Sequence, residues 1–309
     1  MIRRGLYVLA ACLALLNASS AHAANCSATV SNINFGAVNV HAGAVNQTSG
    51  TIQVTCSGAL DLLIGICVRF GPGSGGAGAS NSPRYMRRGD GAGLLYELRA
   101  LGNGAAFGTM NEIHTMMPLV LGSGSISIPF YADIVSPGVA IGTGNYSSTF
   151  SGIGDIELAY GVANCNLLEN STTIPSFEVS AEVVASCEID AGSLAFGDVS
   201  TEINQPVDAD SAINVSCTDT TPYTLSLDMG SGGGSDPSNR KMKNLLSSLN
   251  YGIYMDSART QAWGSLPGAT VSGIGTGLNQ SYPVYGRIPA GQTAAVGIYT
   301  DSVLVTVSY

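Results

Sequence analysis

The chain has 309 residues, of which 45% are apolar and 11% are charged. A chain of this length and composition buries enough apolar surface for two domains of ordinary size, which excludes disorder as its main state. Its 40 glycines are about twice the average usage and follow no collagen-like triplet. Together with abundant Ser, Thr, Val and Asn residues, they indicate many short strands joined by turns.

Residues 1–23 have the pattern of a secretory signal peptide. Two arginines precede an apolar run from Leu6 to Leu16, and small residues ending in Ala-His-Ala follow it. The run is shorter than the roughly 20 residues that a membrane-spanning helix needs, and no later segment approaches that length. We therefore predict an exported chain that starts near Ala24.

The predicted mature chain is strongly acidic. Loss of Arg3 and Arg4 with the signal segment reduces the 12 Lys and Arg residues to 10 against 21 Asp and Glu residues, which takes the net charge from −9 to −11. Nucleic acid and anionic membrane surfaces are poor partners for such a chain.

Six of the seven cysteines remain in the mature chain, because Cys12 lies in the signal segment. They stand at positions 26, 56, 67, 165, 187 and 217. An even number of cysteines in an exported chain predicts three disulfides.

Two parts of the chain repeat one cysteine spacing. In each part a Phe-Gly pair begins nine residues after the first cysteine, and the second cysteine follows the first by 30 residues. The first cysteines are Cys26 and Cys187, and the second are Cys56 and Cys217. A repeat of this length predicts two copies of one domain in tandem.

The correspondence continues to the end of both copies, where Gly144-Asn-Tyr146 matches Gly297-Ile-Tyr299. We assign residues 24–165 to an N-terminal domain and residues 187–309 to a C-terminal domain. Residues 166–186 are expected to form an inter-domain strand or linker.

The repeat also predicts how the cysteines pair. The second copy has only Cys187 and Cys217, so Cys26–Cys56 is the equivalent bond of the first copy. Cys67 and Cys165 then remain to pair with each other. This bond would join an inner strand of the first copy to its last one across a long loop.

Alternation of apolar residues predicts an all-β fold. Leu62, Ile64, Ile66, Val68 and Phe70 are expected on one face of a core strand, which places Cys67 on the other face, outside the core. No segment has convincing helical periodicity. Each copy is therefore expected to be an antiparallel β-sandwich or barrel.

Two apolar alternations raise the question of sheet edges. Val303, Val305, Val307 and Tyr309 alternate to the last residue, and no further strand follows to cover the edge. Between the two copies, Phe177, Val179, Ala181 and Val183 also alternate. This second segment is predicted to be a strand that either covers an edge of the first domain or begins the second.

The cysteine spacing and the closing motif Gly297-Ile-Tyr-Thr-Asp301-Ser-Val-Leu-Val-Thr-Val-Ser-Tyr309 resemble the spore coat protein U family, the secreted pilin-like subunits of Csu-type archaic chaperone-usher pili. The resemblance is strong in residues 187–309 and looser in residues 26–165. It implies two tandem immunoglobulin-like domains, the second of which lacks its last strand. It also implies three partners, namely a periplasmic pilus chaperone, the outer-membrane usher and an adjacent pilus subunit that supplies a donor strand.

Within this family, the groove for the chaperone and the donor strand is expected along Val303, Val305, Val307 and Tyr309. Cys26 closely follows the predicted cleavage site, so the chain is expected to accept a strand but not to donate one. With its two domains, it therefore resembles a tip adhesin at the cell surface, which promotes attachment and biofilm formation.

The candidate surface-binding residues form an apolar run between glycines. They are Met110, Ile113, Met116, Met117, Leu119, Val120 and Leu121. If this run is an exposed loop, it forms a patch suited to hydrophobic or abiotic surfaces, or to an unknown receptor. The alternative is an ordinary core strand with flanking turns, because periodicity does not separate strand from loop over so short a run.

Catalysis is not expected. The mature chain has only two histidines, His41 and His114, and it lacks a Gly-x-Ser-x-Gly motif, so neither a catalytic triad, a metal site nor a cofactor is predicted. Two binding or structural alternatives remain open. One is a lectin-like secreted module, and the other is a structural component of a spore coat or pilus shaft.

Overall fold

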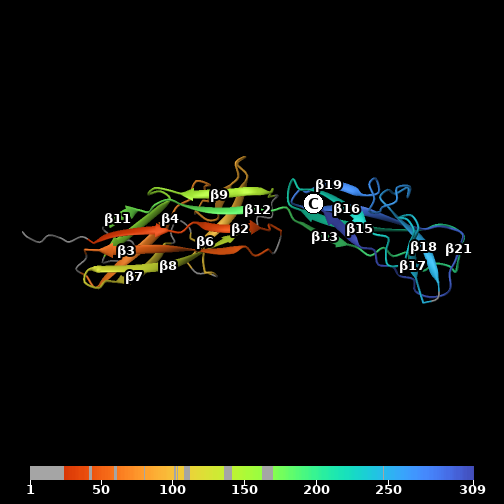
Figure 1. Ribbon diagram of the computed structural model, residues 1–309, viewed down its shortest axis with the longest axis horizontal. Helices are drawn as coiled ribbons and strands as arrows, with labels where there is room; N and C mark the ends of the chain where they lie inside the picture. Colours follow the sequence, from red (N-terminus) through yellow and green to blue (C-terminus); the bar gives the residue numbers. More distant parts are fainter. Residues whose placement is uncertain are drawn as a thin grey trace, which may run out of the picture.

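The computed structural model describes residues 24–309 except 42–43, 59–60, 80, 101, 103, 108–111, 136–140, 162–169 and 246. The predicted signal segment, residues 1–23, lies outside the described residues. The described part of the chain consists of strands, turns and loops in two domains that lie end to end (Figure 1). No helix in this part is long and apolar enough to cross a bilayer.

The first domain has two antiparallel sheets that contain one parallel strand pair. The larger sheet has the order β1 (Asn25–Val30), β3 (Gln47–Ser57), β8 (Ser123–Ile134), β6 (Gly93–Arg99), β5 (Arg84–Arg87), β9 (Gly144–Phe150), β12 (Phe177–Val183) and β2 (Ile33–Val38). The smaller sheet has the order β11 (Asn170–Thr173), β10 (Ile156–Gly161), β4 (Leu63–Phe70) and β7 (Ile113–Pro118). The all-β prediction is confirmed for this domain.

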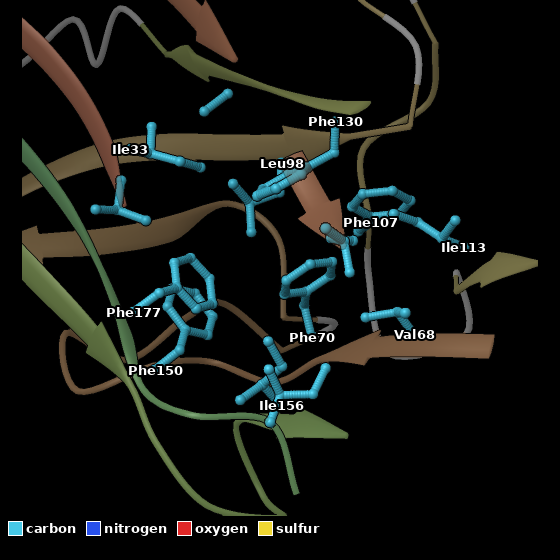
Figure 2. Close-up of a cluster of buried hydrophobic side chains, with 14 of the residues drawn as sticks. Ile33, Val68, Phe70, Leu98, Phe107, Ile113, Phe130, Phe150, Ile156 and Phe177 are labelled. Atoms are coloured by element: carbon cyan, nitrogen blue, oxygen red, sulfur yellow. The ribbon is translucent and has the colours of Figure 1, made fainter. Parts of the chain in front are cut away.

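A cluster of buried phenylalanines occupies the core of the first domain (Figure 2). Phe70 lies near its centre, with its ring centroid 5.4 Å from that of Phe130 and 6.0 Å from that of Phe177. The Phe177 ring stacks on the Phe150 ring with their centroids 4.7 Å apart. Stacked and edge-to-face aromatic pairs stabilise a core beyond the area that they bury.

Strand β12 completes the larger sheet of the first domain. It pairs antiparallel with β9 and parallel with β2, and Phe177, Val179, Ala181 and Val183 are all buried in the first core. Of the two roles considered for this segment, it therefore covers an edge of the first domain. Residues 166–186, expected to be an inter-domain strand or linker, thus supply β11 and β12 to the first domain.

Strand β4 differs from the sequence prediction at Leu62 and agrees with it at Cys67. The inward-facing residues from Ile64 to Phe70 are buried as expected, but Leu62 precedes the strand and is 80% exposed. The alternation of buried residues in this strand therefore begins at Ile64 and not at Leu62. Cys67 is fully buried against Ala159, apart from the main core, and is disulfide-bonded. Its predicted partner, Cys165, lies outside the described residues.

The second domain repeats this architecture with fewer strands. Its largest sheet has the order β13 (Cys187–Ala191), β15 (Val207–Cys217), β20 (Asn279–Ile288), β18 (Ser248–Tyr254) and β17 (Arg240–Lys243). A second sheet has the order β19 (Val271–Ile274), β16 (Pro222–Leu227) and β22 (Val305–Ser308). Strands β14 (Glu202–Ile203) and β21 (Gln292–Thr293) form a short pair.

The first two disulfides are present as predicted. Cys26–Cys56 joins β1 to β3, and Cys187–Cys217 joins β13 to β15. Both bonds link residues directly opposite each other in an antiparallel pair. The equal spacing in sequence therefore reflects an equal register in the two domains.

Each domain also has one buried arginine at an equivalent place. The Arg84 guanidinium donates to the carbonyl oxygens of Phe70, Gly71 and Phe107 at 2.7–2.8 Å. Burial lowers the pKa of Arg84 to about 10. Arg240 binds three carbonyl oxygens of the second domain in a similar way. Because the donors of a buried guanidinium must be satisfied, these bonds hold the segments that supply the carbonyl oxygens close to each arginine.

Replacement of Phe177 by Ala tests whether β12 belongs to the first domain. It leaves a cavity in the aromatic cluster, so we expect the unfolding free energy of the first domain to fall by about 3–5 kcal/mol. Urea unfolding of residues 24–186, which contain all the strands of the first domain, is followed by tyrosine signals and circular dichroism and measures the change. The control is Ile153→Ala, which removes an exposed side chain of the same domain and should change stability by less than about 0.5 kcal/mol. Equal effects of the two substitutions would contradict the assignment.

Candidate strand-binding groove and apolar pole

The repeat lets each strand of the second domain be compared with its equivalent in the first. In the first domain β4 pairs with β10 on one side and β7 on the other, and in the second β16 pairs in the same way with β22 and β19. The outer edge of β10 is covered by β11. Within the described residues, no strand pairs with the outer edge of β22.

Loss of this cover exposes apolar side chains along β22. Ile156, Leu158 and Tyr160 of β10 are buried. Their equivalents are Val305, Val307 and Tyr309, since Val305 and Val307 face β16 as Ile156 and Leu158 face β4. The two valines are half-buried and Tyr309 is 60% exposed. Of the predicted groove residues, Val305 and Val307 thus lie on this uncovered strand, Val303 precedes it and Tyr309 follows it.

The opposite wall of the same opening is also uncovered. In the first domain, residues 33–38 form β2 and pair with β12. The equivalent residues 194–199 of the second domain form no strand, and their apolar side chains Leu194, Phe196 and Val199 are only partly buried. Their exposure has the same cause, because no strand of the described part of the chain lies against them as β12 lies against β2.

Between these two walls lie two adjoining cavities of about 440 and 560 Å³. Leu194, Phe196, Met242 and Tyr299 line both cavities, which makes them one continuous opening. Of the predicted groove residues, Val303 and Val305 line the first cavity. We call this opening the open groove. It lies where β12 lies in the first domain, and its apolar lining residues include Leu194, Phe196, Val303 and Val305.

Tyr299 anchors one wall of the open groove. Its hydroxyl donates to the Ala295 carbonyl oxygen at 3.0 Å and also contacts the Ser247 hydroxyl. In the first domain the Tyr146 hydroxyl donates to the Gly142 carbonyl oxygen at 2.8 Å, again four residues earlier. The wall therefore keeps the same local structure whether or not a strand covers it.

Asp301 holds the glycine-rich loop after β16 to the same wall. Its carboxylate accepts bonds from the Gly232 amide at 2.8 Å, the Ser231 hydroxyl at 2.9 Å and the Tyr251 hydroxyl at 2.7 Å. Burial and the bond to Asp301 raise the pKa of Tyr251 above its ordinary value. In the first domain Ser148 takes this position and accepts a bond from a backbone amide of the equivalent loop.

The predicted surface-binding run divides into a buried and an exposed part. Ile113, Met116 and Met117 belong to β7, an edge strand beside β4, and Leu119 follows it. Ile113, Met117 and Leu119 are buried in the core. Their expected exposure is therefore wrong, because alternate residues of an edge strand face the core. Met116, Val120 and Leu121 are exposed. Met110 lies outside the described residues.

Leu62 and Leu63 are also exposed and lie beside this part of the run, although they were not among the predicted surface-binding residues. Leu63 lies opposite Pro118 in the β4–β7 pair, and the Leu119 amide donates to the Leu62 carbonyl oxygen. We call Leu62, Leu63, Met116, Val120 and Leu121 the apolar pole. Strand β7 lies at the end of the first domain that is far from the second domain (Figure 1).

The turn between β7 and β8 presents Leu121 in an unusual backbone conformation. Leu121 and Gly122 have φ values of 51° and 76°, and Val120 and Ser123 bridge on either side. A positive φ at both central residues is typical of a type I′ turn, which favours Asn or Gly. A leucine here costs about 1–2 kcal/mol and is fully exposed, so neither folding energetics nor core packing accounts for it.

The two histidines do not come together. The His41 ring contacts the Ser186 carbonyl oxygen at the domain junction, whereas His114 is exposed on β7. Among the described residues, no three His, Cys, Asp or Glu side chains are grouped to hold a metal ion.

Comparison with known proteins identifies the family. The profile of the Spore Coat Protein U domain matches residues 12–152 and 173–306, and the chain belongs to this family. It is also similar to Protein U of Myxococcus xanthus, with 30% identity over 156 residues that span 46% of this chain and 87% of that protein.

Solved structures also match this chain over most of its length, and the first of the two described here shares its fold. One is the CsuC–CsuE chaperone–tip adhesion subunit pre-assembly complex from the archaic chaperone-usher Csu pili of Acinetobacter baumannii. The match has a TM-score of 0.57 and 19% identity, and covers 92% of this chain and 100% of that one. The CupB6 tip adhesin of Pseudomonas aeruginosa matches with a TM-score of 0.33 and 13% identity, covering 92% of this chain and 94% of that one.

Replacement of Asp301 by Ser, the residue at the equivalent position of the first domain, tests the role of this carboxylate. A serine hydroxyl replaces fewer of its hydrogen bonds, so we expect the second domain to lose about 2–3 kcal/mol of unfolding free energy. Trp263 is the only tryptophan and is fully buried in this domain. Its fluorescence follows the urea unfolding of the mature chain refolded with a synthetic peptide of residues 170–186, the equivalent of the strand that the second domain lacks.

The matched control is Asp190→Ser, which removes an exposed carboxylate from β13 of the same domain. It should change stability by less than about 0.5 kcal/mol. A loss of the same size in both variants would show that the net charge, and not the bonds of Asp301, is responsible.

Proposed function

We propose that this chain is a tip adhesin subunit of an archaic chaperone-usher pilus, and that its second domain accepts a donor strand from the adjacent pilus subunit. The observation that carries the proposal is the difference between the two copies of the domain. The first contains β11 and β12, and the second has an open groove where their equivalents would lie. An unpaired edge beside an apolar groove favours binding of an extended strand.

The proposed partners follow from the open groove. A periplasmic pilus chaperone covers it before assembly, the outer-membrane usher exchanges the chaperone for the donor strand, and the subunit then reaches the cell surface. The similarity in fold to a chain described as part of a chaperone–tip adhesion subunit complex supports this order. Membership of the Spore Coat Protein U family agrees with it.

The first domain acts at the free end of the fibre. Its sheets are complete, so it needs no donor, and its apolar pole lies at the end opposite the second domain. We propose that this pole attaches the pilus to hydrophobic or abiotic surfaces and so promotes biofilm formation. Each leucine that leaves water on contact contributes about 1.5–3 kcal/mol, and many fibres per cell multiply the effect. The protein thus acts by binding and not by catalysis.

Production of the mature chain in a bacterial periplasm, with and without its cognate chaperone, tests the groove. We expect a soluble complex with the chaperone, and aggregation or proteolysis without it, because an uncovered apolar edge associates with other chains. Size-exclusion chromatography of the periplasmic extract measures both. Residues 24–186 alone serve as the control and should be monomeric without the chaperone. A stable monomer of the full mature chain without the chaperone would overturn the donor-strand proposal.

Attachment of piliated cells to polystyrene tests the apolar pole. The double variant Leu62→Asp/Leu121→Asp should lower attachment at least about tenfold, since it removes two exposed leucines from the contact. The matched control is Leu245→Asp/Leu266→Asp, because Leu245 is 102% exposed and Leu121 is 101% exposed, but Leu245 lies in the second domain.

Cells with the pole variant and cells with the control variant should carry equal numbers of pili, counted by electron microscopy, which confirms that assembly is unchanged. Wild-type attachment of the pole variant would contradict the proposed surface contact. Binding to glycans that persists in that variant would favour a lectin-like module, and labelling along the whole fibre would favour a shaft component.

A further inference from the structure

We infer that the open groove binds its donor strand in the polarity and register that β11 and β12 have in the first domain. The donor would run antiparallel to residues 297–303 and parallel to residues 194–199. It would place a large apolar side chain beside Val303 and a small one beside Tyr299. This inference rests on the proposed function of the groove and adds the sequence pattern of the partner strand.

The first domain supplies the template for this register. In the β9–β12 pair, Phe177 lies opposite Phe150, Val179 opposite Ser148, Ala181 opposite Tyr146, and Val183 opposite Gly144. On the other side of β12, Val179 lies beside Ile33 and Val183 beside Val38 in the parallel pair with β2. One strand therefore joins β9 to β2, which do not pair with each other.

The equivalent positions of the second domain follow from its equal spacing. Gly144, Tyr146 and Ser148 correspond to Gly297, Tyr299 and Asp301, and Phe150 then corresponds to Val303. The backbone agrees with this assignment, because Gly144 and Gly297 both have a large positive φ, 133° and 151°. On the other wall, counting from Cys26 and Cys187 makes Ile33 equivalent to Leu194 and Val38 equivalent to Val199.

The wall from Gly297 to Val303 is held in place without a donor. Thr300 and Lys243 exchange two backbone hydrogen bonds, at the place where Ser147 pairs with Arg87 in the first domain. The Ser231 amide donates to the Ser302 carbonyl oxygen at 3.0 Å, as the amide of Ser74 does to Thr149 in the first domain.

Together with the hydroxyl bond of Tyr299, these contacts preorganise the wall, so an incoming strand meets the same backbone geometry as β12 does. The bonds of Asp301 are already made within the domain, so the donor needs no charged partner for it.

Side-chain size sets the donor pattern along this wall. Phe177 stacks on Phe150, and since Val303 is smaller than Phe150, the open groove has room for a large apolar side chain there. Ala181 lies opposite the buried ring of Tyr146, where a longer side chain would clash, and the same limit applies beside Tyr299. The donor would therefore carry large, medium, small and medium apolar residues at alternate positions.

The donor would also extend past the groove to cover β22. In the first domain β11 continues the same chain segment as β12 and pairs with β10, with Thr173 opposite Glu157 and Asn170 opposite Tyr160. Their equivalents on the second domain are Thr306 and Tyr309. A single donor segment of the length of residues 170–183 thus covers both the groove and the exposed edge.

Cross-linking on the exposed face of the donor measures polarity and register. The probe is a synthetic peptide with the sequence of residues 170–186, added while the mature full-length chain refolds from denaturant. Glu178 and Glu182 point away from the core, opposite Thr149 and Asn145. Thr149 and Asn145 correspond to Ser302 and Ile298, whose exposed side chains lie at the rim of the open groove.

We expect a peptide with Glu178→Cys to form a disulfide with the chain variant Ser302→Cys, and a peptide with Glu182→Cys to do so with Ile298→Cys. Directly opposite residues of an antiparallel pair lie close enough for this bond. The peptide with Glu178→Cys should not link to Ile298→Cys, and the peptide with Glu182→Cys should not link to Ser302→Cys; these two are the crossed combinations. Reducing and non-reducing electrophoresis with mass spectrometry identifies each product.

Crossed products would overturn the inference and leave the groove function intact, because they report a bound strand of the opposite polarity. Absence of every product would overturn the proposed function itself.

Peptide affinity gives a second readout by fluorescence anisotropy. Ala181→Phe and Phe177→Ala in the peptide should each weaken binding at least about tenfold, whereas the outward-facing Glu178→Gln should leave it unchanged. Equal affinity of all three peptides would contradict the size pattern.

Discussion

A buried strand edge needs hydrogen-bond partners and an apolar cover at the same time, and this single requirement shapes the whole protein. In the first domain the requirement is met within the chain, because β11 and β12 pair with the uncovered strands and fill the core with Phe177. In the second domain the equivalent segments border the open groove. The two copies therefore have one fold but two states of completion.

The first domain acts as an internal reference for the second. Both domains keep an arginine buried among carbonyl oxygens, a tyrosine bonded to a carbonyl four residues earlier, and a disulfide between the same two strands. None of these anchors belongs to the strand that the second domain lacks. They explain how the second domain keeps a shaped groove in place of a collapsed core, since each anchor is satisfied before any donor arrives.

The apolar pole shows how one apolar run serves two purposes. Alternate residues of β7 face the core, while the turn that follows presents Val120 and Leu121 to solvent. Leu62 and Leu63 join them from a distant part of the sequence, because β4 and β7 are neighbours in the sheet. An exposed leucine at positive φ weakens folding slightly, which favours a role for it outside the fold.

The sequence by itself determined the all-β class, the tandem repeat and two disulfides, because spacing and alternation reflect local strand geometry. It also placed the valines of β22 on one face. Only the tertiary structure decided that β12 covers the first domain, that Ile113, Met117 and Leu119 are buried, and that Leu62 is exposed. These outcomes depend on which strands become neighbours across long stretches of chain. Strand pairing is non-local, so no single segment carries it.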